Sequence, residues 1–574
     1  MIDRTLPEWD LSTIFSSVHG DDFKAALSSV SSLCSSVKKM IEESRPLGEV
    51  IDVYNRLLAV YETLGSYTGA LYTTDTSNPE YVRAIGNVEA HSTEVSECEN
   101  LFLSFLMERK DEINSPELKD YTYVLSHMLE DGRHRMSIAE ESLAADLARS
   151  GSSAFSRLFD ALTSSMNDDG HTLTQLRSDA YSPDRNVRKS SYEREKKILH
   201  ENRTALAAAL NGIKGTCLTI EKRQGWSDPL EHSLFISRLS RKAFDALLEA
   251  LEKGLPVFRR YFRAKAVLLG LDVLEWYDLF APLEAGDEHR EYSFADAREI
   301  IIRCYSSFSP AMGDFAGKAF ERRWIDAPAH SGKSGGAYDS AFPIVKESRV
   351  FTNFSFDYSS VSTLAHELGH AYHDSLVMSK PSLLSSYPMT LAETASIFAE
   401  QIVFREILKE SDEKEAVRII ETFVSDAAQV CVDILSRFYF EKSLFEKRRE
   451  GEVSADELSL LMKDAQDRSY GDAVRDKHEL MWAVKSHYYS ADFSYYNYPY
   501  AFGQLFALSL FSRSCDDAAF ASEYEKLLSI TGMCSADDAA LSIGCDISDV
   551  SFWMEGIELI EKYVERIEDF ARKM

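Results

Sequence analysis

Apolar residues recur three and four positions apart along most of this chain, and this spacing restricts the fold more than any other feature of the sequence. The pattern is clearest over residues 22–41, 80–110 and 240–253. In the last of these segments, Phe244, Leu247 and Leu251 fall on one stripe of a helix, while charged residues occupy the rest of its surface. The sequence therefore predicts a mainly α-helical protein, and its 574 residues suffice for two or more hydrophobic cores.

One region interrupts the helical pattern. Residues 327–338 contain one proline and three glycines, and residues 349–356 are rich in aromatic and β-branched residues that alternate by two, which predicts a strand. We expect a loop, a strand and then a helix that begins near Ser359, and we expect this irregular part to carry the functional site.

Gly-Lys-Ser at residues 332–334 is typical of phosphate-binding loops, but Ala327 stands where that motif requires its first glycine. We interpret this segment as an ordinary flexible glycine loop.

Composition excludes several classes of partner. The formal net charge of −30 argues against nucleic acids and anionic membranes, which need a basic surface. No apolar stretch approaches the roughly 20 residues that cross a bilayer. The chain begins with acidic residues rather than with a secretory signal, and its eight cysteines are dispersed without a C-x-x-C pair, which is typical of reduced thiols. We therefore expect a cytoplasmic protein, and the sequence leaves its oligomeric state open.

The motif H-E-x-x-H occurs at residues 366–370. On a helix, His366 and His370 lie one turn apart on the same face, so their imidazoles can share a tetrahedral zinc ion at Zn–N distances of about 2.0–2.1 Å. Glu367 is rotated by about 100° from His366, which lets it act as a base on water at the metal without being a ligand. A serine among residues 359–362 can cap this helix. The alternative interpretation is a surface helix that happens to carry two histidines.

A zinc site of this kind needs a third ligand from elsewhere. The extended metzincin pattern is excluded, because it requires glycine and histidine where this chain has His373 and Leu376. The other common solution is a glutamate on a second helix, and residues 390–400 fit, with Glu393 and Glu400 two turns apart on one face. We assign Glu393 to the metal and Glu400 to a hydrogen bond with a ligand histidine, while the reverse assignment stays open. His373 could compete as a ligand, but we expect it to cap or pack nearby.

These motifs resemble those of the oligoendopeptidase F family, a branch of the thimet-type M3 zinc peptidases. The likeness rests on His-Glu-Leu-Gly-His-Ala-Tyr-His at residues 366–373, followed by Ala-Glu-Thr-Ala-Ser at residues 392–396. Three further segments resemble the same family: residues 9–12, 153–160 and 265–279. The resemblance therefore covers most of the chain.

The resemblance implies a two-part helical molecule with zinc at the floor of a deep channel that admits short peptides and excludes folded proteins. It also implies a strand beside the substrate, which residues 350–356 match, and an extended peptide could pair with the exposed edge of that strand. We expect an N-terminal helical domain at residues 1–185 and a zinc peptidase catalytic domain at residues 186–574.

Residues 487–503 are exceptionally rich in tyrosine. Aromatic packing explains such a segment, but tyrosine hydroxyls and histidine N–H groups are also suitable donors for the negative charge that develops on a peptide carbonyl during hydrolysis. The family uses a histidine and tyrosines from such a segment for this task, and His487 is the best match, followed by Tyr498 and Tyr496. Because the spacing departs from the thimet-like pattern, the choice among Tyr495, Tyr496 and Tyr498 stays open.

Together these features predict a zinc-dependent endopeptidase that hydrolyses short oligopeptides. His366, His370 and Glu393 would bind Zn²⁺, and Glu367 would be the general base. A helical zinc carboxypeptidase is the close alternative. That type of enzyme typically has the sequence H-E-S around its third ligand, whereas Ala392 precedes Glu393 in this chain. A catalytically silent peptide-binding protein with the same fold is the alternative from another class.

Overall fold

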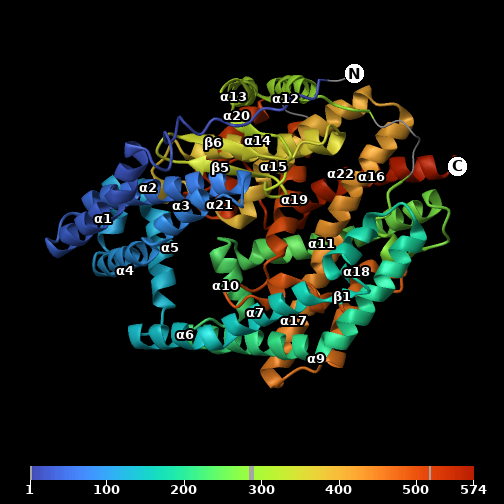
Figure 1. The fold of residues 1–574 in the computed structure, drawn as a ribbon, viewed down its shortest axis with the longest axis horizontal. Helices are drawn as coiled ribbons and strands as arrows, with labels where there is room; N and C mark the ends of the chain where they lie inside the picture. The colour runs from blue at the N-terminus through green and yellow to red at the C-terminus, as the bar shows by residue number, and fades with distance from the viewer. Residues whose placement is uncertain (1–2, 284–289, 516–518) are drawn as a thin grey trace. The chain divides into compact units, whose positions relative to one another are not determined.

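The computed structural model describes residues 3–283, 290–515 and 519–574 and is mainly α-helical with small β-sheets, which confirms the predicted fold class (Figure 1). It divides into two compact units, each assembled from three separate segments of the chain. Unit 1 comprises Met1–Arg133, Glu288–Lys409 and Arg513–Cys545, and unit 2 comprises His134–Asp287, Glu410–Ser512 and Asp546–Met574. The domain boundary that we expect between residues 185 and 186, and the channel that the resemblance implies, stay predictions.

Unit 1 contains an amino-terminal group of helices and a second group that surrounds a small sheet. The first group is α1 (Asp21–Glu42), α2 (Leu47–Thr74), α3 (Pro79–Glu89), α4 (Ser92–Glu108) and α5 (Thr122–Arg133). The second group is α12 (Phe294–Phe308), α13 (Pro310–Glu321), α14 (Tyr358–Val377), α15 (Met389–Glu410), α20 (Phe520–Ile530) and α21 (Ala536–Leu541). The single helix predicted over residues 80–110 is in fact α3 and α4, because the His91 N–H bonds to Val88 O three residues back and tightens the turn between them.

The sheet of unit 1 has three strands in the order β4-β6-β5. These are β4 (Ile325–Asp326), β5 (Tyr338–Phe342) and β6 (Glu347–Phe351); β4 runs parallel to β6, and β5 runs antiparallel to it. Helix α14 packs against β5 and β6 (Figure 1). The prediction of an exposed edge on the strand near residues 350–356 was wrong, since β6 is central and the edge strands are β4 and β5.

The predicted strand over residues 349–356 also extends too far. After β6 ends at Phe351, the Phe354 N–H bonds to Ala327 O, and Phe356 adopts a left-handed conformation with φ of 66°. These features turn the chain out of the sheet. Asp357 then caps α14, its side chain accepting the Ser360 N–H at 2.8 Å, so the cap is an aspartate rather than one of the serines at 359–362.

The opening segment of the chain belongs structurally to this sheet. Trp9 packs against Tyr338 and Phe351, with ring centroids 6.5 and 5.9 Å apart. The Asp10 N–H bonds to Arg323 O at 2.7 Å. Residues at the start of the sequence therefore cover strands that lie more than three hundred positions further on.

The glycine loop before β5 is anchored by its lysine. The Lys333 ammonium is fully buried and donates to Asp326 Oδ1 at 2.5 Å, Pro328 O at 2.8 Å and Thr352 O at 2.7 Å. Because the Lys333 ammonium donates its hydrogen bonds to these oxygens, it is not available to bind a phosphate. The Gly-Lys-Ser sequence is thus a structural anchor, and the loop is less free than we expected.

Unit 2 is a helical body with two short two-stranded pairings. Its helices are α6 (Ile138–Ser150), α7 (Ser152–Ser165), α8 (Leu173–Ser178), α9 (Arg185–Gln224), α10 (Pro229–Ile236), α11 (Arg241–Leu268), α16 (Glu413–Ala428), α17 (Ile434–Glu450), α18 (Ala455–Tyr470), α19 (Tyr498–Ser514) and α22 (Val550–Ala571). Its strands are β1 (Asn167–Asp168) with β2 (His171–Thr172), and β3 (Leu274–Glu275) with β7 (Val474–Arg475). The helix predicted over residues 240–253 is α11, which continues past Pro256.

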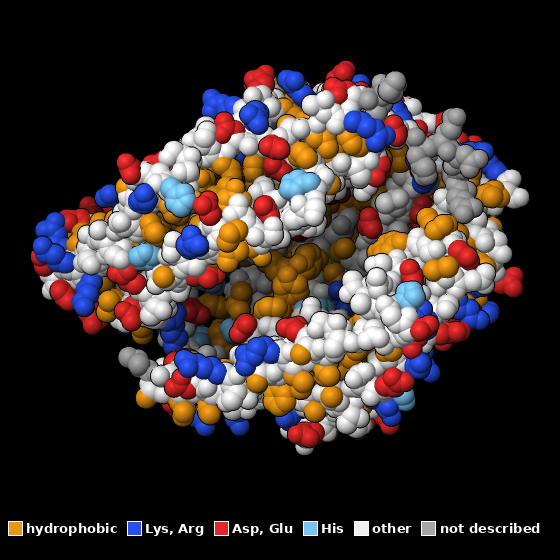
Figure 2. Space-filling model, in the orientation of Figure 1, with side chains coloured by type: hydrophobic (Ala, Val, Ile, Leu, Met, Phe, Trp, Pro, Cys, Tyr) orange, Lys and Arg blue, Asp and Glu red, His pale blue; other side chains and the backbone are white. Residues whose placement is uncertain are grey.

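The visible surface of the amino-terminal helices carries both signs of charge. Figure 2 shows Asp, Glu, Lys and Arg side chains interspersed over α1 and α4 rather than a continuous basic stripe. Within the described ranges, no helix is long and apolar enough to span a bilayer.

Candidate metal centre

Three ligand atoms converge where α14 faces α15 in unit 1. His366 Nε2 and His370 Nε2 lie 3.2 Å apart, and Glu393 Oε2 lies 3.3 Å from the first and 3.5 Å from the second. A tetrahedral ion with bonds of about 2.0–2.1 Å holds its ligand atoms about 3.3 Å from one another. The spacing of the three atoms therefore fits one tetrahedral zinc ion, with a fourth position left for water or substrate.

Other side chains orient these ligands. The Nδ1–H of His366 donates to Glu400 Oε1 at 2.5 Å, which directs Nε2 of the same ring toward His370 and Glu393. The Ser396 hydroxyl donates to Glu393 Oε2 at 2.8 Å. Glu393 and Glu400 thus lie on one face of α15, and only Glu393 reaches both histidines.

A glycine sets the distance between the two helices. A Cβ atom added at Gly369 would lie 2.7 Å from Ala395 O, 2.8 Å from Ser396 Cα and 2.8 Å from Ala399 Cβ. Two of these are backbone atoms, which cannot move aside without moving the helix. Gly369 lies between the two histidines in sequence, so the close approach of α15 is greatest at the site itself.

Burial and neighbouring charges have opposite effects on the pKa values of these groups. Burial raises the pKa of Glu393, but hydrogen bonds from His366 and His370 outweigh it and hold the pKa well below its usual value. Burial lowers the pKa of His366, yet Glu400 and Glu393 outweigh this and raise the pKa well above its usual value. Glu367 is only 6% exposed, and burial raises the pKa of its carboxyl despite the opposing effect of the two histidines.

His373 packs in the core instead of joining the ligands. Its ring is fully buried and stacks on Tyr387 with centroids 4.1 Å apart, and its Nε2 lies 2.7 Å from Thr531 Oγ1. Burial lowers the pKa of His373 to about 3, so the ring stays neutral. This agrees with our expectation that His373 packs beside the site.

A pair of buried carboxyls, one turn beyond His370 on α14 and on the neighbouring strand β5, was not anticipated from the sequence. Asp374 accepts a hydrogen bond from the Tyr387 hydroxyl at 2.7 Å, and the carboxyl of Asp339 on β5 lies near enough to interact with it electrostatically. Burial raises the pKa of both carboxyls. Asp374 follows His370 by four positions on one helix face, and this spacing was the signal available in the sequence.

Comparisons with known proteins agree with this geometry. The family model described as "Peptidase family M3" matches residues 179–545, and a model described as "Oligopeptidase F" matches residues 110–167. The first match covers more than half of the chain. The chain belongs to peptidase family M3. Members of this family are metallopeptidases that act on oligopeptides, which confirms the resemblance to oligoendopeptidase F.

Individual relatives of this M3 family member extend over nearly the whole chain. An oligoendopeptidase F homolog from Lactococcus lactis subsp. lactis is 25% identical and aligns with 98% of this chain and 97% of its own length. A crystal structure from Chlamydophila abortus has a TM-score of 0.82 at 20% identity and covers 98% of this chain and 100% of that chain. Oligoendopeptidase F from Enterococcus faecium has a TM-score of 0.68 at 17% identity, covering 96% and 99% respectively. The two structural likenesses show the fold.

The other predicted site residues of this M3 family member, His487, Tyr496 and Tyr498, lie in unit 2. His487 belongs to η8 (Ser486–Tyr489), and its ring lies near that of Tyr496, with centroids 6.2 Å apart. The hydroxyls of Tyr496 and Tyr500 are hydrogen-bonded to each other at 2.9 Å. Tyr500 is therefore a member of this cluster that the sequence analysis did not single out, although the richness of the segment in tyrosine was visible.

Tyr498 differs from its neighbours. It is 4% exposed, and its hydroxyl lies 3.1 Å from Ser233 O and 2.8 Å from Ser237 Oγ, which ties the start of α19 to the end of α10. Its hydroxyl already has partners within unit 2, whereas Nε2 of His487 is buried without a hydrogen-bond partner among the described residues.

The contact at Gly369 leads to a testable expectation. Gly369→Ala should push α15 away from α14 by several tenths of an ångström, separating Glu393 from the histidines. We expect kcat/KM on an internally quenched peptide to fall on the order of 100-fold, with reduced metal content by elemental analysis. Gly86→Ala in α3 is the matched control, because a Cβ there meets open space. Unchanged activity and metal content in Gly369→Ala would show that this contact does not set the site geometry.

Proposed function

We propose that this chain is a zinc-dependent endopeptidase that hydrolyses internal bonds of short oligopeptides. The observation that carries the proposal is the convergence of His366 Nε2, His370 Nε2 and Glu393 Oε2 within 3.2–3.5 Å of one another. Two imidazoles and one carboxylate with an open fourth position are the donor set of hydrolytic zinc sites. Membership of family M3 supports the same chemistry.

Glu367 acts as the general base and then as the acid in this proposal. A bound zinc ion supplies Lewis acidity, which makes water more acidic and polarises a carbonyl group. The Glu367 carboxylate accepts a proton from the attacking water and delivers it to the nitrogen of the departing amine. Burial raises the pKa of Glu367 above its usual value, which suits a group that must both take up and release a proton.

His487 and the tyrosines, on the family resemblance, donate to the negatively charged oxygen of the transition state. Burial, followed by the nearby cations Arg437 and Lys485, lowers the pKa of His487 to about 2, so the ring is a neutral N–H donor. Tyr496 is the favoured tyrosine, because the Tyr498 hydroxyl is buried and bonded to Ser233 and Ser237, whereas in the part of the chain that the structure describes the Tyr496 hydroxyl is bonded only to another tyrosine hydroxyl, that of Tyr500.

The sheet of unit 1 offers a way to hold an extended peptide. β5 is an edge strand, and α14 packs directly against it. A peptide that adds to an edge strand gains main-chain hydrogen bonds that do not depend on its sequence. This would place an extended substrate beside the helix that carries Glu367.

A cytoplasmic location and the lack of nucleic-acid or membrane partners remain part of the proposal. All eight cysteines are free thiols, which suits a reducing compartment. The oligomeric state is not part of the proposal.

The central test separates metal binding from proton transfer. Glu367→Gln should keep stoichiometric zinc and lower kcat by at least 10³-fold, because the amide cannot accept the proton. His366→Ala should lose both zinc and activity, since it removes a ligand. Elemental analysis and hydrolysis of a quenched peptide measure the two properties separately.

Glu108→Gln is the matched control for that test, because this exposed side chain of α4 lies outside the centre. It should leave zinc content and activity unchanged. Full activity in Glu367→Gln would refute the assigned role of the base, and full zinc content in His366→Ala would refute the ligand set.

The position of cleavage distinguishes the endopeptidase from a carboxypeptidase. We expect mass spectrometry of digested ten-residue peptides to show internal cuts, with equal rates for peptides that end in a free carboxylate or in an amide. Stepwise loss of single residues, confined to the free carboxylate, would instead identify a carboxypeptidase. Addition of a zinc chelator should stop either reaction.

His487→Phe tests the proposed oxyanion donor. The substitution keeps an aromatic ring but removes the N–H, so we expect kcat to fall by about 10²–10³-fold with little change in KM. His487→Gln, which restores an N–H donor, should lose less. His200→Phe, at an exposed position of α9, is the control and should be as active as the parent protein. Equal kcat values for His487→Phe and the parent would remove His487 from the mechanism.

A further inference from the structure

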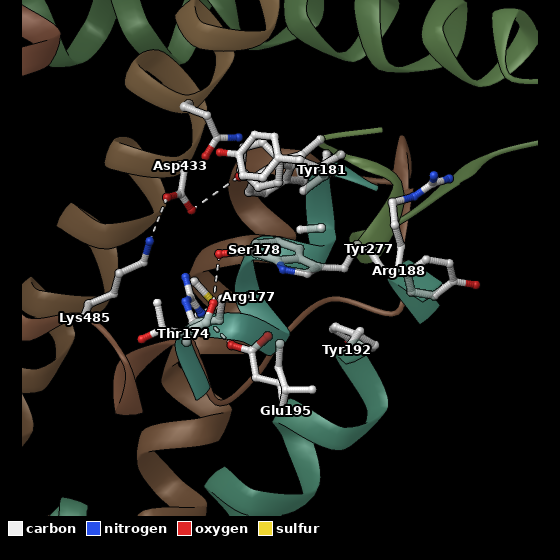
Figure 3. Close-up of a pocket in the computed structure, with 18 of the residues that line it drawn as sticks. Thr174, Arg177, Ser178, Tyr181, Arg188, Tyr192, Glu195, Tyr277, Asp433 and Lys485 are labelled. Atoms are coloured by element: carbon white, nitrogen blue, oxygen red, sulfur yellow. Dashed lines mark hydrogen bonds and ion pairs between the residues drawn. The ribbon is translucent and has the colours of Figure 1, made fainter. Parts of the chain in front are cut away.

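A cavity of about 490 Å³ lies wholly within unit 2, and its lining includes none of the proposed metal ligands, the proposed base or the proposed oxyanion donors. Its lining comes from α8, η3 (Asp179–Tyr181), α9, η4 (Trp276–Asp278), η6 (Gln429–Asp433), α17, α18, η7 (Met481–Ala483) and the segment before η8. The volume is within the range of about 300–1,000 Å³ that small-molecule sites occupy. In Figure 3, Lys485 and Asp433 lie on one side of this cavity and Tyr192, Tyr277 and Arg188 on the other.

The arginines that line the cavity are already neutralised by carboxylates. Each has a partner within hydrogen-bond distance: Arg177 with Glu195 at 2.5 Å, Arg437 with Asp433 at 2.8 Å and Arg188 with Asp278 at 3.0 Å. In these ion pairs the arginines neutralise the carboxylates around the cavity. A further cation in the lining would therefore be left in excess.

Lys485 is that further cation. Its side chain is 17% exposed, and its ammonium lies 3.7 Å from Asp433 Oδ2, which is an ion-pair contact beyond the usual hydrogen-bond length of about 3.2 Å. The same oxygen of Asp433 already accepts two N–H groups from Arg437. Among the residues that the structure describes, the Lys485 ammonium donates no hydrogen bond to any acceptor.

The Lys485 side chain is mostly buried, but its ammonium is not among the fully buried polar atoms, so an incoming ligand can reach it. Burial, partly offset by Asp433, lowers the pKa of Lys485 to about 8. An anion placed beside the ammonium would supply both the missing hydrogen bond and the missing charge.

Aromatic rings supply the rest of the cavity wall. Tyr192 and Tyr277 pack with centroids 5.6 Å apart, and Tyr181 packs on Phe280 with centroids 5.0 Å apart. Tyr181 remains 63% exposed, although its ring is large and partly apolar. These faces suit the apolar or aromatic body of a ligand whose charged end meets Lys485.

The backbone beside Lys485 is also unusual. η6 (Gln429–Asp433), between α16 and α17, is a π-helical segment, and both of its end residues line the cavity. Short π segments are rare and occur frequently at functional sites, because they turn side chains away from the regular helical positions. This is a second, independent sign that the cavity has a function.

We propose that the cavity of unit 2 binds a small carboxylate with an aromatic or apolar body, and that Lys485 holds the carboxylate. The ligand could be the carboxyl end of a short peptide or a free organic acid, which share this chemistry. The inference concerns a site separate from the metal centre and does not depend on the proposed peptidase mechanism.

Calorimetric titration of the full-length zinc-loaded protein with N-acetyl-phenylalanine at pH 7 tests the proposal. The acid should bind, and N-acetyl-phenylalanine amide, which lacks the charge, should bind at least tenfold more weakly. Lys485→Met should weaken binding of the acid at least tenfold, and Lys485→Arg should recover part of it. Lys463→Met, at an exposed position of α18, is the matched control and should bind like the parent protein.

Two further measurements separate the alternatives. Phenylacetate that binds as tightly as N-acetyl-phenylalanine indicates a free acid as the ligand, whereas much weaker binding of phenylacetate indicates a peptide carboxyl end. The His366→Ala variant should retain the binding, because the site does not involve the metal. Loss of binding in His366→Ala, or equal affinity for acid and amide, would overturn the proposal.

A labelling experiment covers the case in which Lys485→Met fails to fold. In the unmodified protein, acetic anhydride at pH 8 should acetylate Lys485, and N-acetyl-phenylalanine should slow this reaction at least threefold by peptide mapping. Acetylation of Lys463 should not change. Equal labelling of Lys485 with and without the acid would contradict the proposal.

Discussion

The candidate centre depends on how closely α14 and α15 approach each other. The two histidines come from one helix and the third ligand from the other, so the separation of the helix axes fixes the separation of the ligand atoms. Gly369 permits that separation, because any side chain there would meet the backbone of α15. The rest of unit 1 holds α14 in position: the Tyr305 hydroxyl donates to Ala365 O at 2.6 Å, and the Tyr372 hydroxyl donates to Glu525 of α20 at 2.8 Å.

The carboxylates of the centre favour a positive charge among them. Glu367, Glu393 and Glu400 gather around two imidazoles, and all three carboxylates are at least partly buried. Such a group of like charges is unfavourable in the interior of a protein unless a positive charge lies among them. The carboxylates therefore favour a positive charge at this position, and despite burial Glu400 and Glu393 raise the pKa of His366 for the same reason.

The sequence predicted those parts of the molecule that depend on local spacing. One helical turn between His366 and His370, and two turns between Glu393 and Glu400, are properties of a helix whatever its surroundings. The fold class followed from the same periodicity. Helix starts were less predictable, because Asp357, rather than a nearby serine, supplies the cap of α14.

Features that depend on distant contacts could not be derived in this way. The strand near residues 350–356 ends early because Phe354 bonds to Ala327, and its edge is covered because β5 pairs with it. Lys333 resembled part of a phosphate loop until its buried oxygen partners were known. The electrostatic interaction between Asp374 and Asp339 links a helix to a strand, and no single-segment pattern contains it.

The interleaved course of the chain affects how this protein can mature. Unit 1 is built from the beginning of the chain, from its middle, and from Arg513–Cys545. Trp9 leaves the ribosome long before the strands that it covers, and Thr531, which contacts His373 of α14, emerges long after that helix. Because contacts so distant in sequence form slowly, the site acquires its full set of supports only after Arg513–Cys545 has been synthesised.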